Sequence, residues 1–127
     1  MERNQKFFKC IKCGNIVGIV VEAGNEMLCC KEEMVELIPN TVDAAVEKHI
    51  PVVTINGDEV LVNIGEVDHP MIPEHYIEWI YLETKKGGQR KILEPNESPN
   101  AKFLLVDDKV VAVFAYCNIH GLWKKEI

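Results

Sequence analysis

Residues 110–125 read VVAVFAYCNIHGLWKK, and this stretch indicates most clearly which fold the sequence adopts. A strongly apolar run, Val110–Tyr116, is followed by a short polar segment and then by the run Leu122–Lys125. Short runs rich in β-branched and aromatic residues, bounded by turn residues, are typical of β-strands. The C-terminal end of the chain is therefore predicted to form two β-strands.

Further strand candidates precede this pair along the chain. They are His49–Ile55, Glu59–Ile64, Tyr76–Thr84, Gln89–Leu93 and Ala101–Val106. Turn signals separate several of them, at Asn56-Gly57-Asp58, Lys86-Gly87-Gly88 and Asp107-Asp108. About seven short strands over roughly 90 residues predict a β-sandwich of immunoglobulin-like type, so the fold class is mainly β.

The first 38 residues form a separate segment, punctuated by cysteine pairs and glycines. The runs Ile16–Glu22 and Met34–Ile38 predict two or three short strands around a metal. So short a segment buries little apolar surface, and a bound metal is expected to supply much of its stability. We expect a small metal domain over residues 1–38 and the β-sandwich over residues 39–127. One helical turn is expected near the boundary, over Asp43–Val46, capped by Asn40 or Thr41.

Composition and charge narrow the class of protein. The chain has 127 residues, of which 47% are apolar and 27% charged, as in ordinary globular proteins. The net charge of −6 and the lack of a basic stripe give no support to nucleic-acid binding. No run approaches the ~18 apolar residues of a membrane span, and the N-terminus lacks the apolar region of a signal peptide. We therefore expect a cytoplasmic protein without a membrane or nucleic-acid partner, whose clustered cysteines are metal ligands rather than disulfides.

Four of the five cysteines form one candidate metal site, Cys10-x2-Cys13 with Cys29-Cys30. A Cys-x2-Cys turn aims two sulfurs at one metal. Adjacent side chains of a strand point to opposite faces, so Cys29 and Cys30 can share a metal only through a kinked backbone. Zinc and iron both accept four sulfurs, and the spacing alone does not choose between them. A disulfide is the remaining alternative.

The four histidines and the fifth cysteine gather in three short patches, Glu47-Lys48-His49, His69–His75 and Cys117–His120. Singly, each has an ordinary interpretation as a strand residue, a loop residue or a small core cysteine. Together, imidazoles and one thiolate form the ligand set of a redox-active transition metal. Five ligands are too many for tetrahedral zinc and leave an octahedral metal one open position, which favours iron. A blue-copper site, with two histidines, a cysteine and a weak axial ligand, is the nearest alternative.

These motifs resemble those of the desulfoferrodoxin family, the two-iron superoxide reductases, over nearly the whole chain. Besides the four-cysteine pattern, the resemblance rests on four stretches: Glu47-Lys48-His49, His69-Pro70-Met71, His75-Tyr76-Ile77-x-Trp79 and Ala115-Tyr116-Cys117-Asn118-Ile119-His120-Gly121-x-Trp123. It implies a distorted rubredoxin-like iron on Cys10, Cys13, Cys29 and Cys30. It also implies a catalytic ferrous centre with four equatorial histidines, His49, His69, His75 and His120, and with Cys117 axial.

The resemblance further implies an activity, partners and two catalytic side chains. The expected reaction is one-electron reduction of superoxide to hydrogen peroxide, with electrons from rubredoxin or a similar donor, in a homodimer. Lys48 is expected to attract the superoxide anion, and Glu47 to ligate the ferric iron after turnover. A non-enzymatic electron carrier or a zinc-stabilised binding protein is the alternative function.

Overall fold

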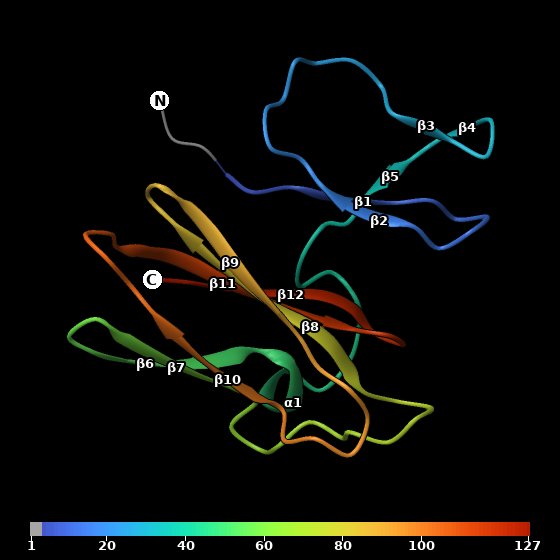
Figure 1. The fold of residues 1–127 in the computed structure, drawn as a ribbon. Coiled ribbons are helices and arrows are strands. Elements are labelled where there is room, and N and C mark those ends of the chain that lie inside the picture. Colours follow the sequence, from blue (N-terminus) through green and yellow to red (C-terminus); the bar gives the residue numbers. More distant parts are fainter. Residues whose placement is uncertain (1–3) are drawn as a thin grey trace. The chain divides into compact units, whose positions relative to one another are not determined.

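The computed structural model describes residues 4–127 and divides the chain after Ile38 into two compact units. In both units the regular structure is almost entirely β, with one four-residue helix in the described residues (Figure 1). The prediction of a mainly β fold is therefore confirmed. No helix in residues 4–127 is long and apolar enough to cross a membrane.

The first unit is built from very short strands. A three-stranded antiparallel sheet has the order β2(Ile16–Gly18), β1(Phe7–Lys9), β5(Val35–Glu36), and β3(Leu28–Cys29) pairs with β4(Glu32–Glu33). These five strands exceed the two or three expected from the sequence. Among the described residues of this unit, the buried side chains are Phe7, Cys10 and Met34. So small an apolar core agrees with a unit that depends on a metal.

The second unit, Pro39–Ile127, contains two antiparallel sheets. One has the order β10(Asn100–Leu104), β7(Glu59–Ile64), β6(Pro51–Asn56). The other has the order β12(Gly121–Glu126), β11(Val110–Cys117), β8(Ile77–Thr84), β9(Gly87–Ile92). All seven strands predicted for this part of the chain are present, each within two residues of its expected bounds. Figure 1 shows the two sheets as separate layers.

The hydrophobic core of the second unit lies between its two sheets. Along β7, buried and more exposed residues alternate, so that Val60, Val62 and Ile64 point into the core. The opposite sheet contributes buried residues from β8 and β11, among them Ile80, Leu82, Val113, Ala115 and Cys117. Cys117 is therefore both the last residue of a central strand and a member of the core.

The helix α1(Val46–His49) begins three residues later than predicted. Its N-cap is Ala45, which makes no side-chain capping bond. Asn40 does not cap it but pairs with strand β12, accepting the Lys124 N–H at 2.9 Å and donating to the Lys124 carbonyl at 3.1 Å. The predicted strand start at His49 is also wrong, because His49 is the last helical residue. Tertiary hydrogen bonds have overridden the local capping signals.

Candidate metal centres

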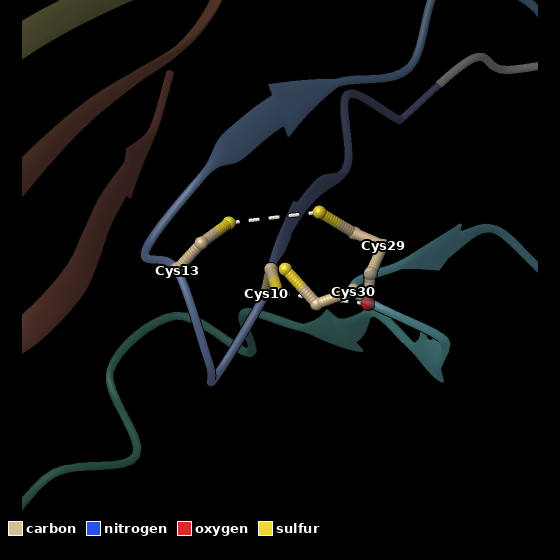
Figure 2. A group of neighbouring side chains, drawn as sticks. All are labelled: Cys10, Cys13, Cys29 and Cys30. Carbon is tan, nitrogen blue, oxygen red and sulfur yellow. Dashed lines mark hydrogen bonds between the residues drawn. The ribbon is translucent and has the colours of Figure 1, made fainter.

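Four sulfur atoms of the first unit face one another (Figure 2). Cys10 and Cys13 come from the segment after β1, and Cys29 and Cys30 come from the β3–β4 hairpin. The four Sγ atoms all lie within 4.8 Å of one another, and the Cys13 and Cys29 sulfurs are 3.6 Å apart. All five cysteines are free, so no disulfide closes this cluster.

The turn between β3 and β4 explains how adjacent cysteines reach one cluster. Cys30 and Lys31 both have positive φ, 53° and 65°. A two-residue turn with positive φ at both positions corresponds to a type I′ hairpin. The kink expected from the Cys29-Cys30 pair is therefore present, and it swings the Cys30 side chain toward the other sulfurs (Figure 2).

Hydrogen bonds shift the pKa values of these thiols in opposite directions. The Cys13 backbone N–H lowers the pKa of Cys10 to about 7. The Cys13 side chain raises the pKa of Cys30 to about 12. Four adjacent thiolates repel one another, so the fully ionised cluster needs a cation at its centre. This donor set fits a tetrahedral metal ion.

The second cluster lies in the second unit, at the end of α1 and in two connections between strands. His49 ends α1, His69 and His75 lie between β7 and β8, and Cys117 ends β11. One ligand atom from each of these four lies within 4.8 Å of the others. His120, in the turn before β12, adjoins this group of four: its Nδ1 is 3.1 Å from His49 Nε2 and 3.9 Å from Cys117 Sγ.

Backbone hydrogen bonds place the ligand-bearing residues. The His69 N–H donates to the Ile64 carbonyl at the end of β7, at 3.2 Å. His75 and Ile72 exchange N–H···O bonds of 3.0 and 3.1 Å, which close a short loop around Pro73 and Glu74. The His69 backbone is thus tied to the end of β7, whereas His75 is paired within its own short loop.

Hydrogen bonds of the His49 and His69 rings assign the proton of each ring to Nδ1 and leave the two neighbouring Nε2 atoms with lone pairs. His49 Nδ1 lies 2.6 Å from the Ala45 carbonyl, and His69 Nδ1 lies 2.7 Å from the Pro70 carbonyl. A carbonyl can only accept, so in the neutral rings the proton is assigned to Nδ1. The two Nε2 atoms, 3.2 Å apart, then have no proton to share. A cation bound by both resolves this repulsion.

Burial keeps the three histidine rings neutral and disfavours ionisation of the Cys117 thiol. Burial lowers the pKa of His69 to about 4 and also lowers the pKa values of His49 and His75, so all three rings are neutral near pH 7. The Nε2 atom of His75 is buried without a hydrogen-bond partner in residues 4–127. Burial raises the pKa of Cys117, so a metal must displace its proton. The donors fit a transition metal that takes imidazole and thiolate ligands.

Glu47 and Lys48 lie on α1, exposed, directly before His49. The positive charge of Lys48, after burial and the charge of His120, lowers the pKa of His75, so it acts at the cluster. The α1 backbone is held in place because the Glu47 carbonyl accepts the Val67 N–H at 3.1 Å. Lys48 is thus an exposed lysine directly before a histidine of the cluster.

The structure adds supporting residues to which the sequence had given no role. The Trp123 ring stacks on His49, with centroids 4.7 Å apart, and its Nε1–H donates to the His120 carbonyl at 3.2 Å. The Ala45 and Pro70 carbonyls, which orient two of the rings, leave no signal in the sequence. For Trp123, the only indication in the sequence was its position in the motif that ends the Ala115–Trp123 stretch.

Comparisons with known proteins identify the family of the chain. The desulfoferrodoxin family model matches residues 41–126. A desulfoferrodoxin from Nitratidesulfovibrio vulgaris is 42% identical over 126 residues, 99% of each chain. A superoxide reductase from Pyrococcus horikoshii is 39% identical over 99 residues, covering 64% of this chain and 86% of that protein.

Among solved structures, the superoxide reductase from Treponema pallidum superposes with a TM-score of 0.82 at 42% identity, over 98% of this chain and 100% of that one. A superoxide reductase from Giardia intestinalis, described as a one-iron form, gives 0.55 at 32% identity, over 64% and 97%. The first of these likenesses extends over both units of the present chain. By its sequence and by its structure, the chain belongs to the desulfoferrodoxin family.

Proposed function

We propose that this protein is a superoxide reductase: it combines superoxide with one electron and two protons to form hydrogen peroxide. The reaction takes place in the second unit, at an iron ion held by five residues, His49, His69, His75, His120 and Cys117. When bound, the iron would supply the ferrous–ferric couple for the one-electron reduction. A second iron is held by the four cysteines of the first unit.

The observation that carries this proposal is that unprotonated histidine Nε2 atoms lie close together in the same cluster as a buried cysteine thiol. The Nε2 atoms of His49 and His69 lie 3.2 Å apart with both Nδ1 protons donated elsewhere. Cys117, 0% exposed, brings a sulfur into the same cluster. This mixed set of imidazoles and one thiolate suits a redox-active iron and exceeds what structural zinc requires.

Lys48 attracts and orients the superoxide anion. The chain carries a net charge of −6, which repels a small anion on average. Lys48 is exposed, and its charge is felt at His75. It thus offers a local positive field at the edge of an otherwise acidic protein. Its position next to His49 in the sequence keeps its backbone close to the cluster, which supports this role.

Glu47 would supply a further carboxylate ligand to the iron in its ferric state. It is exposed and directly precedes Lys48 on α1. Its backbone carbonyl accepts the Val67 N–H at 3.1 Å, which holds the α1 backbone, so an approach of the exposed side chain to a bound iron would take place by side-chain rotation. Its negative charge also raises the pKa of His49, after the larger effects of burial and neighbouring groups, which supports a carboxylate close to the rings.

Partners and setting complete the proposal. A reductase of this kind consumes one external electron per turnover, and a rubredoxin or similar small redox protein supplies it. The protein is a homodimer, as its family resemblance implies. Five free cysteines support a reducing compartment, the cytoplasm.

Metal analysis with visible spectroscopy tests the proposal. The purified protein should contain two irons per chain. Its oxidised form should show a rubredoxin-like spectrum and, in addition, a separate ferric-thiolate band that superoxide also produces. One or two zincs per chain and a colourless protein would contradict the proposal and favour a zinc-stabilised binding module. Two irons without a fast reaction with superoxide would instead indicate an electron carrier.

A further inference from the structure

Asn118 joins two of the segments that carry ligands in the second cluster. It follows Cys117 directly, and its side chain reaches the residues on both sides of His75. Its Oδ1 accepts the Tyr76 N–H at 2.9 Å, and its Nδ2 donates to the Glu74 carbonyl at 3.0 Å. Its own backbone N–H donates to the Tyr76 carbonyl at 3.2 Å. Three hydrogen bonds therefore connect the two segments.

The segment that these bonds hold is otherwise weakly anchored. Ile72, Pro73 and Glu74 are all exposed, and the loop that they form is closed by the backbone pair of Ile72 and His75. His75 itself is half-buried, while its Nε2 atom is buried in the cluster. A loop with so little packing needs a further tie to hold one ring in a fixed place. Asn118, half-buried between the segments, supplies that tie.

We propose that Asn118 is a positioning residue that fixes the His75 ring relative to the Cys117 sulfur and thereby sets how tightly the cluster binds its metal. The inference rests on the proposed iron site. No contact of Asn118 with a ligand atom is needed, because its bonds go to the backbone on either side of His75. Groups that orient metal ligands in this way typically contribute about 10- to 100-fold to metal affinity.

Two substitutions separate the side-chain bonds. Asn118→Ala removes both, whereas Asn118→Asp keeps an acceptor for the Tyr76 N–H and loses the donor to the Glu74 carbonyl. Each iron-loaded, full-length variant is titrated with a ferrous chelator, and the ferric-thiolate band is recorded after oxidation. We expect about 10- to 100-fold weaker retention of the histidine-bound iron in Asn118→Ala, a smaller loss in Asn118→Asp, and a shifted band in both.

The controls distinguish positioning from general damage. The four-cysteine iron in the same chain serves as an internal reference and should be retained as in the wild type. Asn100→Ala, at an exposed asparagine of β10, should change neither the affinity nor the band. Unchanged retention and an unchanged band in Asn118→Ala would overturn the inference, and so would equal losses from both metal sites. If Asn118→Ala does not fold, Asn118→Asp alone decides by the same readouts. Because the readout is metal binding, a wild-type protein that holds iron but does not reduce superoxide would refute the proposed function and leave this test intact.

Discussion

At the scale of single residues, backbone carbonyls give the histidine cluster its chemistry. The sequence indicated which residues would gather in one cluster, because all four histidines and one cysteine fall in three patches. It could not indicate which ring nitrogen would be free, since that depends on the carbonyls of Ala45 and Pro70. Those contacts form only when the chain has folded. Every residue has a backbone carbonyl, so the residue types do not reveal which carbonyl will accept a histidine proton.

Lys48 carries the most direct prediction at this scale. Lys48→Ala should lower the second-order rate constant for superoxide by up to about 10-fold at low ionic strength, because the charge that steers the anion is lost. The difference from wild type should shrink as salt is added, since the Debye length is about 8 Å at physiological ionic strength. Stopped-flow kinetics over a range of salt concentrations measures both effects.

Lys125→Ala is the matched control for this prediction. It removes the same charge from an exposed lysine of β12, outside the residues of the cluster. Its rate constant should stay close to that of the wild type. Equal rate constants for Lys48→Ala and wild type at low salt would remove the steering role.

At the scale of elements, the strands followed from sequence patterns and the helix did not. Runs of β-branched and aromatic residues, with turn residues between several of them, located all seven strands of the second unit to within two residues. The helix α1 was displaced because its partner is a loop distant in sequence. Gly65 has a φ of 89°, and a Cβ there would lie 2.7 Å from the Lys48 carbonyl oxygen. That close approach lets the Gly65 N–H donate to the Ile50 carbonyl at 3.2 Å and the Val67 N–H donate to the Glu47 carbonyl at 3.1 Å, and no local capping signal could have predicted these bonds.

Asp108 links the β8–β9 turn to the loop before β11, and its carboxylate makes stability depend on pH. A hydrogen bond from Thr84, together with the N–H groups of Lys109 and Lys86, lowers its pKa below the usual 3.8. When a carboxyl has a lower pKa in the folded than in the unfolded state, its charged form stabilises the fold at any pH above the unfolded-state pKa. This stabilisation is lost as the pH falls through the folded-state pKa. Asp108→Asn should therefore lower the urea midpoint at pH 7, and the deficit should shrink below about pH 4.

Asp107→Asn provides the comparison for this variant. It changes the neighbouring charge at a residue of positive φ that asparagine also tolerates, and it should leave the pH dependence as in the wild type. Acid releases metal from the wild type and from both variants alike. The differences between their urea midpoints therefore report the effect of the Asp108 carboxylate alone. A deficit in Asp108→Asn that persisted unchanged to pH 3 would contradict the proposed charge dependence.

At the scale of the whole molecule, each of the two units holds one of the two candidate metal clusters. The family model matches residues 41–126, wholly inside the second unit, and that unit holds all four histidines and Cys117. The first unit holds the four-cysteine cluster, with its two pairs of ligands on separate loops. The pairing of cysteines into one cluster was predictable from spacing, whereas its shape depended on two consecutive residues of positive φ. The proposed reaction is therefore assigned to the second unit.

The yield of hydrogen peroxide per superoxide consumed tests the central claim most directly. The reduced protein, kept reduced by an excess of an electron donor under anaerobic conditions, is exposed to a measured amount of superoxide. A reductase is predicted to form one hydrogen peroxide for every superoxide consumed and to release no dioxygen. One hydrogen peroxide for every two superoxide anions, with release of dioxygen, would show dismutation and would contradict the account.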